Sequence, residues 1–345
     1  MIRVIIVDDS IFFRKIISDI MVSIENVEVV ATASSGNIAL SKVQQLMPDL
    51  VTMDVEMPGM DGIKTLQEVK DIHPDAHVVM ISSKTASSAQ HTIEALSRGA
   101  LEFIEKPDGS SGDSNELDFE RALKNIVRLV EMRRYLGATA SRPVTAPSRP
   151  SFTPRQVEII AIGISTGGPA SLPAVLSELP DNFSVPIVIV QHIPPTFVGA
   201  LVDSLNQKCV IKIQEAKPDM SLEKGTVYLA PGGRQMKLTK RIGQEDPVIA
   251  ITDDPAENFC KPSVDYLFRS VADLYGQRAL GVIMTGMGRD GTEGAKVMKD
   301  QGASIIAQDE ATSIVYGMPM EAAKAGVVDL VLPLDQIAAE LKRQI

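Results

Sequence analysis

Short apolar segments alternate with helical patterns over the first third of the chain. The apolar runs are Arg3–Val7, Val27–Ala33, Leu50–Met53, Val78–Ile81 and Phe103–Ile104. A final helical segment at about Leu117–Tyr135 keeps its apolar residues on one face. Strands that alternate with helices in this way predict a five-stranded, doubly wound parallel sheet.

The same alternation resumes after residue 156. The candidate strands are Val157–Ile164, Pro186–Gln191, Ala279–Met284, Ala303–Ala307 and Val328–Leu332. They are nearly all apolar, as expected for parallel strands that are covered on both faces. Between about residues 210 and 252, short runs with turn residues predict one or two antiparallel hairpins. The prediction is a second, larger and mainly parallel α/β domain with an antiparallel hairpin.

A proline-rich segment separates the two patterns. Residues 137–156 read GATASRPVTAPSRPSFTPRQ, with four prolines, many small residues and no acidic residue. Such a composition predicts a flexible linker between domains. We therefore place a first domain at residues 1–125, with a last helix extending up to residue 136, a linker at 137–156 and a second domain at 157–345.

Charge and composition narrow the functional classes. The formal net charge of −10 over 345 residues disfavours nucleic-acid binding, which needs clustered Lys and Arg. The cysteines, Cys209 and Cys260, lack C-x-x-C spacing and indicate neither a disulfide framework nor a zinc site. No apolar run approaches the ~20 residues that span a bilayer, and the N-terminal segment does not resemble a signal peptide. We expect a cytoplasmic protein with no nucleic-acid partner and no membrane insertion.

Acidic residues, a hydroxyl and a lysine follow the strands of the first domain. Asp8 and Asp9 end the first strand, Asp54 the third and Ser82 the fourth, and Lys106 follows the fifth. The carboxyl ends of parallel strands share one edge of the sheet, so these side chains should converge. Carboxylates held together repel each other unless a cation such as Mg²⁺ lies among them. Asp54 could then attack a phosphoryl donor, with Lys106 and Ser82 contacting the phosphate.

The alternative is that these acids are solvated strand-end residues, but the hydroxyl of Ser82 and the Lys-Pro pair at Lys106 favour a common phosphate-accepting site. Over about residues 1–125 the set resembles the response-regulator receiver family, which has a flavodoxin-like fold. The resemblance implies phosphorylation of Asp54 by a histidine kinase, with Mg²⁺ bound by Asp8, Asp9, Asp54 and the backbone carbonyl of Glu56. Phe103 matches the aromatic switch position of the family and equally suits packing at a strand end.

A glycine-rich turn follows the first strand of the second domain. Gly163-x-Ser165-x-Gly167 fits the spacing of a nucleophile elbow, in which a sharp strand-to-helix turn exposes a serine hydroxyl. Similar turns also cradle phosphates and nucleotides, so the motif alone does not decide between these uses.

A serine nucleophile needs a base, and the base needs an orienting acid. His192 is the only histidine after the linker and follows the apolar run IVIVQ, so it should share a sheet edge with Ser165. Asp290, in TGMGRDG, also follows a strand, and its alternative role is to cap the next helix. The competing acids are Asp253, Asp254 and Asp309. Glycines around Met287 could leave its backbone N–H available to stabilise an oxyanion.

Six short motifs extend this pattern along the second domain: GISTGGP, VQHIPP, YLAPGG, KPSVDYLF, TGMGRDG and YGMP. Behind a receiver and a linker, they are similar to the CheB family of chemotaxis protein-glutamate methylesterases over nearly the whole chain. The resemblance implies a triad of Ser165, His192 and Asp290 and an oxyanion donor at the Met287 backbone. It implies hydrolysis of γ-glutamyl methyl esters on chemoreceptors, deamidation of receptor glutamines and no cofactor for the esterase.

The resemblance also implies control of the esterase by the receiver. In the family reading, the unphosphorylated receiver packs over the hydrolase cleft, and phosphorylation by the chemotaxis histidine kinase loosens it. One departure is Cys260-Lys261, where we expect His-Arg before Pro-Ser-Val-Asp, and it bears on substrate positioning rather than on the triad. We expect Cys260 to be a structural thiol rather than a nucleophile. Two other classes stay open: a non-catalytic ligand-binding domain and a nucleotide-binding enzyme.

Overall fold

The computed structural model describes residues 1–107, 113–139, 157–241, 243 and 246–343. The chain divides into two units, Met1–Val144 and Thr145–Ile345. Most of the predicted linker, residues 140–156, lies outside the described residues, so its flexibility stays a prediction. Within the described ranges, no helix has both the length and the apolar character that crossing a membrane requires.

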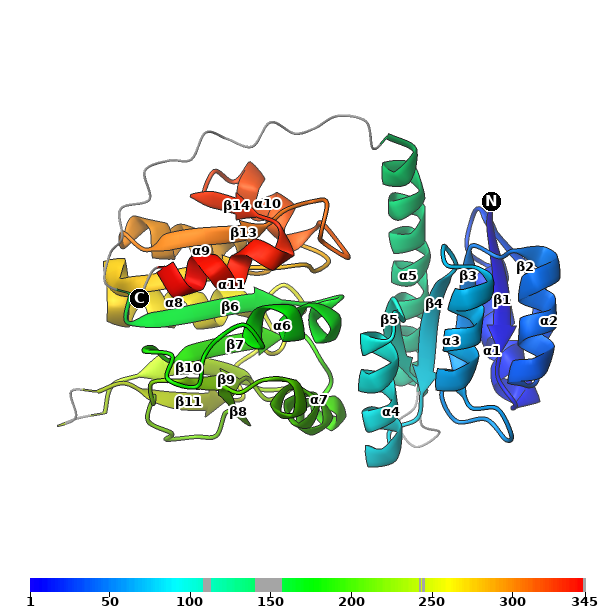
Figure 1. The fold of residues 1–345 in the computed structure, drawn as a ribbon, viewed down its shortest axis with the longest axis horizontal. Coiled ribbons are helices and arrows are strands. Elements are labelled where there is room, and N and C mark those ends of the chain that lie inside the picture. The colour runs from blue at the N-terminus through cyan, green and yellow to red at the C-terminus, as the bar shows by residue number, and fades with distance from the viewer. Residues whose placement is uncertain (108–112, 140–156, 242, 244–245, 344–345) are drawn as a thin grey trace. The chain divides into compact units, whose positions relative to one another are not determined.

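The first unit contains a five-stranded sheet in the order β2-β1-β3-β4-β5, with every pairing parallel (Figure 1). Its strands are β1 (Ile2–Val7), β2 (Val27–Ala33), β3 (Leu50–Asp54), β4 (His77–Ser82) and β5 (Glu102–Glu105). Its helices are α1 (Ile11–Val22), α2 (Gly36–Leu46), α3 (Gly62–Ile72), α4 (Ala86–Ser97) and α5 (Asp113–Thr139). The predicted doubly wound parallel fold is confirmed, and α5 runs three residues beyond the expected limit of 136.

Helix starts in this unit follow local capping chemistry. The side chains of Ser10, Asp61 and Thr85 each accept a hydrogen bond from a backbone N–H in the first turn of α1, α3 and α4. Each cap satisfies one of the N–H groups that a helix start leaves without a partner. These caps fix where the helices begin just after the strand ends, and so they shape the loops that carry the acidic residues.

A half-buried histidine begins β4. The pKa of His77 is lowered to about 4, mainly by burial and also by the positive charges of Arg133 and Lys70. The negative charges of Asp49 and Asp75 raise it by less. The ring is therefore neutral in the folded unit at neutral pH. Its protonation in acid works against folding.

The second unit is built on a seven-stranded parallel sheet in the order β14-β13-β12-β6-β7-β9-β8, with a separate two-stranded sheet. The strands of the large sheet are β6 (Ile159–Ile164), β7 (Ile187–Gln191), β8 (Lys212–Glu215), β9 (Thr226–Leu229), β12 (Ala279–Ile283), β13 (Ser304–Gln308) and β14 (Leu330–Leu332). The helices are α6 (Gly168–Leu176), α7 (Pro195–Lys208), α8 (Val264–Tyr275), η1 (Gly276–Arg278), α9 (Thr292–Asp300), α10 (Met318–Lys324) and α11 (Leu334–Arg343). The predicted second α/β domain, mainly parallel with one hairpin, is confirmed.

The segment from 210 to 252 differs in part from the hairpins that its turns predicted. Among the described residues of this segment, β10 (Gln235–Thr239) and β11 (Val248–Thr252) pair antiparallel, with an antiparallel bridge between Ser221 and Val248, whereas β8 and β9 join the large parallel sheet. The YLAPGG turn therefore leads from one sheet into the other. A Cβ at Gly232 would lie 2.6 Å from both Ile193 O and Pro195 N, so this turn packs on the loop after β7.

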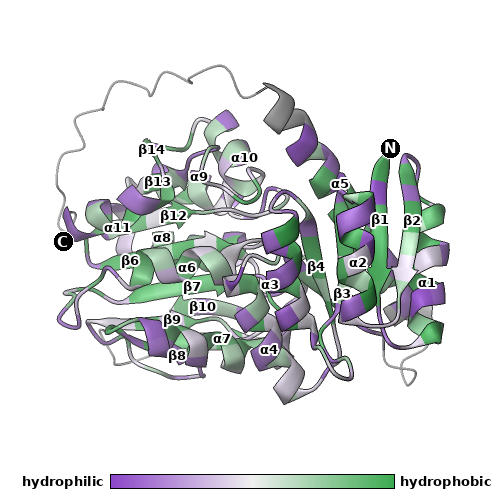
Figure 2. Ribbon diagram, turned by 45° about the vertical axis from the view of Figure 1, so that its right-hand side comes forward, coloured by the Kyte–Doolittle hydropathy of each residue, from purple (hydrophilic) through white to green (hydrophobic). Residues whose placement is uncertain are grey.

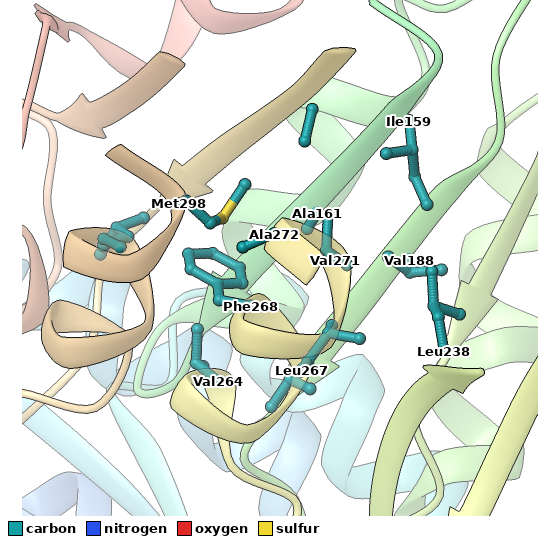
Figure 3. Close-up of a cluster of buried hydrophobic side chains, with 14 of the residues drawn as sticks. Ile159, Ala161, Val188, Leu238, Val264, Leu267, Phe268, Val271, Ala272 and Met298 are labelled. Atoms are coloured by element: carbon teal, nitrogen blue, oxygen red, sulfur yellow. The ribbon is translucent and has the colours of Figure 1, made fainter. Parts of the chain in front are cut away.

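Apolar side chains of α8 form the centre of a buried cluster in the second unit. Figure 3 shows Phe268 and Leu267 of α8 among residues of β6 and β7 and near Met298 of α9. Both Phe268 and Leu267 are fully buried. Figure 2 shows the inner strands of both sheets as mostly hydrophobic, as expected where helices cover the two faces. This packing fixes the start of α8 beneath the loop that follows β12.

Each of the two parallel sheets has a strand at which the strand order reverses and loops from neighbouring strands meet. In the first unit, β1 lies between β2 and β3, and in the second, β6 lies between β12 and β7. In open α/β sheets, ligands bind outside the carboxyl ends of the strands at such a switch point. The loops after β1 and β3, and those after β6, β7 and β12, are therefore the places to look for chemistry.

Candidate functional sites

An acidic cluster lies at the switch point of the first sheet. Asp8 and Asp54 are buried and Asp9 is exposed, and one carboxylate oxygen of each lies within 4.8 Å of the others. The Lys106 Nζ atom is 2.7 Å from Asp54 Oδ2 and 2.8 Å from Asp8 Oδ2. The structure thus brings together four of the residues that the sequence placed at this edge.

The atoms of the acidic cluster that could bind a metal are all oxygen atoms, which are the ligands that Mg²⁺ prefers. Burial raises the pKa of Asp54 to about 6, although the hydrogen bond and charge of Lys106 lower it. Burial lowers the pKa of Lys106, but its contacts with Asp54 and Asp8 more than reverse this. A single ammonium offsets only part of the charge of three carboxylates, so the cluster fits a divalent cation. The Glu56 N–H lies 3.3 Å from Asp54 Oδ1, and its carbonyl as a metal ligand stays a prediction.

The hydroxyl of Ser82 is buried next to α4. It lies 2.9 Å from Ser88 Oγ and accepts a hydrogen bond of 2.9 Å from Thr92 Oγ1. Sequence reasoning missed both partners, because helical hydroxyls carry no separate signal. To contact a phosphate on Asp54, the Ser82 hydroxyl would exchange these partners. Phe103 is half-buried in β5, and its switch role stays a prediction.

Ser165 directly follows β6 at the turn into α6. Gly167 has a φ of +84°, and Ser165 is not among the residues with positive φ. A Cβ at Gly168 would lie 1.6 Å from Gln191 Oε1, so a larger residue there would displace the Gln191 side chain. The serine itself is therefore not the strained residue that a nucleophile elbow has. The two glycines after it supply the sharp turn instead.

His192 lies beside Ser165 because β6 and β7 pair with Ile164 opposite Gln191. The His192 N–H donates to Ile164 O over 3.1 Å, and Gln191 Nε2 donates to both Ser165 O and His192 O over 3.0 Å. Among the described residues, no hydrogen bond joins the Ser165 hydroxyl to the His192 ring. Such bonds often tighten only when substrate is bound.

Asp290 is the acid that meets His192. Its Oδ2 atom lies 2.8 Å from His192 Nε2, and its side chain is almost fully buried. Its other hydrogen-bond donors are Val264 N at 2.7 Å, Ser263 Oγ at 2.8 Å, Asp265 N at 3.1 Å and Gly291 N at 3.1 Å. The start of α8 and the loop after β12 thus hold one carboxylate from several sides.

The competing acids lie in other contacts. Asp253 pairs with Arg234, and Asp254 accepts a hydrogen bond from the Tyr266 hydroxyl. The side chain of Asp309 accepts hydrogen bonds from the N–H and hydroxyl of Thr312. Spacing could not separate these candidates because each follows or flanks a strand.

The electrostatics of the His192–Asp290 pair favour a charged imidazole. Burial would raise the pKa of Asp290, but the hydrogen bond and charge of His192 lower it. Burial would lower the pKa of His192, but Asp290 and the nearby Cys260 raise it to about 9. The pair can therefore stabilise the imidazolium that forms when the ring accepts a proton from a nucleophile.

Met287 lies in the loop between β12 and α9, close to the serine. A Cβ at the neighbouring Gly286 would lie 2.7 Å from Ser165 Cβ, so this loop passes directly over Ser165. In the part of the chain that the structure describes, the Met287 N–H is hydrogen-bonded to no acceptor. Its position is compatible with an oxyanion donor, a role that stays a prediction.

Two contacts at this site were missed by sequence reasoning. Ser263 hydrogen-bonds to Asp290, and its one signal was a serine directly before a helical pattern. Cys260 is half-buried, with its Sγ atom 3.8 Å from His192 Nδ1. Residue spacing could not show this contact, since the two residues are 68 positions apart.

Two family models match the chain: response regulator receiver domain over residues 4–111 and CheB methylesterase over residues 160–341. A Desulfotalea psychrophila protein named protein-glutamate methylesterase/protein-glutamine glutaminase is 45% identical over 354 residues, covering 98% of this chain and 97% of that protein. A Bacillus subtilis protein of the same name is 40% identical, covering 99% and 98%. The crystal structure of the Thermotoga maritima CheB methylesterase catalytic domain is 36% identical with a TM-score of 0.53, covering 55% of this chain and all of that one.

Proposed function

Because the chain belongs to the CheB family of protein-glutamate methylesterases with a response-regulator receiver domain, we propose that Ser165, His192 and Asp290 catalyse its reaction. The protein is a protein-glutamate methylesterase and protein-glutamine glutaminase of chemotactic adaptation, regulated through its receiver. The main support for the three residues is the His192–Asp290 hydrogen bond, formed at the sheet edge where Ser165 follows β6.

The reaction is an acyl transfer in two steps. Since Asp290 occupies Nε2 of His192, Nδ1 is the nitrogen that takes the Ser165 proton as the serine oxygen attacks the ester carbonyl. We infer that the Met287 N–H stabilises the oxyanion. His192 then returns the proton to the leaving methanol, and water hydrolyses the glutamyl-enzyme by the reverse sequence. With a glutamine side chain, ammonia leaves in place of methanol.

The receiver supplies the control. Asp54 attacks the phosphoryl group of the donor and forms an acyl phosphate, while Lys106 pairs with the phosphoryl oxygens. Mg²⁺, held by Asp8, Asp9, Asp54 and the Glu56 carbonyl, would supply positive charge to balance these groups. We infer that the donor is a chemotaxis histidine kinase, that methyl-accepting chemoreceptors are the substrate and that the protein acts in the cytoplasm.

The test is methanol release from methylated receptor membranes, with and without a small phosphodonor. Ser165→Ala should abolish release and leave phosphorylation of Asp54 intact. Ser177→Ala, an exposed serine at the end of α6, is the matched control and should release methanol at the wild-type rate. Normal methanol release by Ser165→Ala would refute the assignment. A fluorophosphonate probe should label Ser165, since a non-catalytic binding domain has no activated serine to react.

A further inference from the structure

The active-site histidine has a thiol on the side opposite its carboxylate. Asp290 contacts Nε2 of His192 at 2.8 Å, and the Sγ atom of Cys260 lies 3.8 Å from Nδ1. The three side chains each offer one ligand atom within 4.8 Å of the others. The mechanism proposed above uses Nδ1 and Asp290 but has no role for the thiol.

Cys260 is held in place by a short turn. Residues Glu257 and Cys260 exchange backbone hydrogen bonds of 3.1 and 2.7 Å, and Asn258 and Phe259 between them have φ values of +50° and +63°. The Asn258 side chain donates to Asp265 Oδ2 over 2.9 Å, which ties the turn to the start of α8. The position of the thiol is therefore set by the same helix start that holds Asp290.

The spacing of the two atoms suits a shared metal ion. Zinc lies about 2.0–2.1 Å from an imidazole nitrogen and about 2.3 Å from a thiolate. At a tetrahedral angle these bonds place the nitrogen and sulfur about 3.6 Å apart. The observed separation of Nδ1 and Sγ, 3.8 Å, needs a shift of only a few tenths of an ångström.

Asp290 fits the role of a supporting carboxylate rather than of a ligand. A carboxylate offers about four lone-pair positions, and Asp290 already has five hydrogen-bond donors around it. Histidines that bind a metal through one nitrogen usually donate the other N–H to a carboxylate, which fixes the tautomer. The contact between Asp290 and Nε2 is this arrangement, and it leaves Nδ1 as the metal-facing nitrogen.

We propose that His192 Nδ1 and Cys260 Sγ form a site for a thiophilic divalent metal ion such as Zn²⁺, which inhibits the enzyme reversibly. Binding displaces two protons, one from the thiol and one from Nδ1 of the charged imidazole: Cys–SH, HisH⁺ and M²⁺ give a thiolate- and imidazole-bound M²⁺ of net charge +1 and two H⁺, with no change of oxidation state. Water completes the coordination. Inhibition follows because the metal occupies the nitrogen that accepts the Ser165 proton, and this step rests on the proposed function. Two protein ligands bind less tightly than a closed four-ligand site, so chelation should reverse the effect.

The binding test uses the full chain with Co²⁺ as a spectroscopic substitute for Zn²⁺. Excess Mg²⁺ is added to fill the receiver cluster, whose oxygen ligands give no thiolate signal. Wild type and Cys209→Ser, the matched control, should show a near-ultraviolet thiolate–Co²⁺ charge-transfer band that Zn²⁺ abolishes. Cys260→Ser should lack it. A band retained in Cys260→Ser, lost in Cys209→Ser or absent from wild type would overturn the proposal.

Inhibition and protection give two further readouts. The Zn²⁺ concentration that halves methanol release, measured against the metal-free rate of each variant, should be at least about tenfold higher for Cys260→Ser than for wild type. The reason is that loss of even a residue that only supports a ligand lowers metal affinity by about 10–100-fold. In wild type, Zn²⁺ should protect Cys260 but not Cys209 from alkylation, which needs no variant. Equal protection of both cysteines would contradict the site. If metal-free wild type releases no methanol, the proposed function fails, while the band and the alkylation still decide the metal site.

Discussion

Replacing Asp290 with asparagine changes the proton pattern of the site more than its shape. The Asp290 Oδ1 atom accepts three hydrogen bonds, from Ser263 Oγ and two backbone N–H groups, and Oδ2 faces His192 Nε2 and Val264 N. In Asp290→Asn, the amide oxygen should take the three-donor side. The amide NH₂ then faces His192 and the Val264 N–H.

The effect on catalysis follows from the tautomer. An NH₂ group beside Nε2 makes this nitrogen the acceptor and moves the ring proton to Nδ1, the nitrogen that must accept the Ser165 proton. The corresponding change in other serine hydrolases lowers kcat by about 10⁴. We expect a fall of about 10³–10⁴, which corresponds to about 4–5.5 kcal/mol of transition-state stabilisation.

The effect on folding is smaller and separable. The Val264 N–H loses its acceptor in a buried position, which costs about 1–3 kcal/mol. For a unit of this size, 1 kcal/mol lowers Tm by about 2–4 °C, so the expected decrease is about 2–12 °C. The variant should remain folded at assay temperature with a KM close to that of wild type.

The assay is kcat and KM for methanol release, with a thermal melt of each variant. Asp309→Asn is the control, because Asp309 also follows a strand and, within the described part of the chain, its side chain accepts hydrogen bonds from Thr312 alone. It should keep wild-type kcat. A folded Asp290→Asn enzyme with more than about a tenth of wild-type kcat would refute the tautomer reasoning, and an equal loss in Asp309→Asn would point to a general effect of the loops.

Three further outcomes follow from individual contacts. Ser263→Ala should lower the free energy of unfolding by about 2 kcal/mol in denaturant titrations, because it removes both the cap of α8 and a hydrogen bond to Asp290; an unchanged midpoint would contradict this. Asp54→Asn should abolish the stimulation of methanol release by a small phosphodonor, and persistent stimulation would exclude Asp54 as the acceptor. The folded-state pKa of His77 is below its unfolded value, so its contribution is present above pH 6.5 and is lost as pH falls toward 4. The receiver should lose about 1–2 kcal/mol between pH 7 and 5 in denaturant titrations, and His77→Gln should remove this loss.

The two sheets were predictable because parallel strands covered on both faces leave nearly continuous apolar runs. The short strands β8 and β9 were not, since KIQE, and TVYL followed by APGG, have the pattern of a hairpin. What overrides this pattern is the parallel pairing of β9 with β7 and β8, and Gly232 after β9 then packs on the backbone at Ile193 and Pro195. A contact between distant loops decides the topology there, and local sequence does not encode it.

The expectation that side chains at the carboxyl ends of parallel strands converge located the residues of both candidate sites, but it did not show their contacts. It placed Ser165, His192 and Asp290 on one edge because β6, β7 and β12 are parallel neighbours. It could not show which nitrogen of His192 faces Asp290, because that depends on where the start of α8 holds the carboxylate. For the same reason, residue spacing could not predict that the thiol of Cys260 lies beside Nδ1.

The two sites use a buried aspartate in opposite ways, and their hydrogen bonds show why. The carboxylate of Asp54 has Lys106 and one long N–H contact from Glu56, and burial raises its pKa. Asp290 is surrounded by five donors, and its pKa is lowered. A carboxylate that forms a bond to phosphorus needs lone pairs that are not used in hydrogen bonds. A carboxylate that fixes a histidine tautomer can have all of its lone pairs in hydrogen bonds. The number of donors therefore separates the proposed nucleophile, Asp54 at the end of β3, from the proposed orienting residue, Asp290 in the loop after β12.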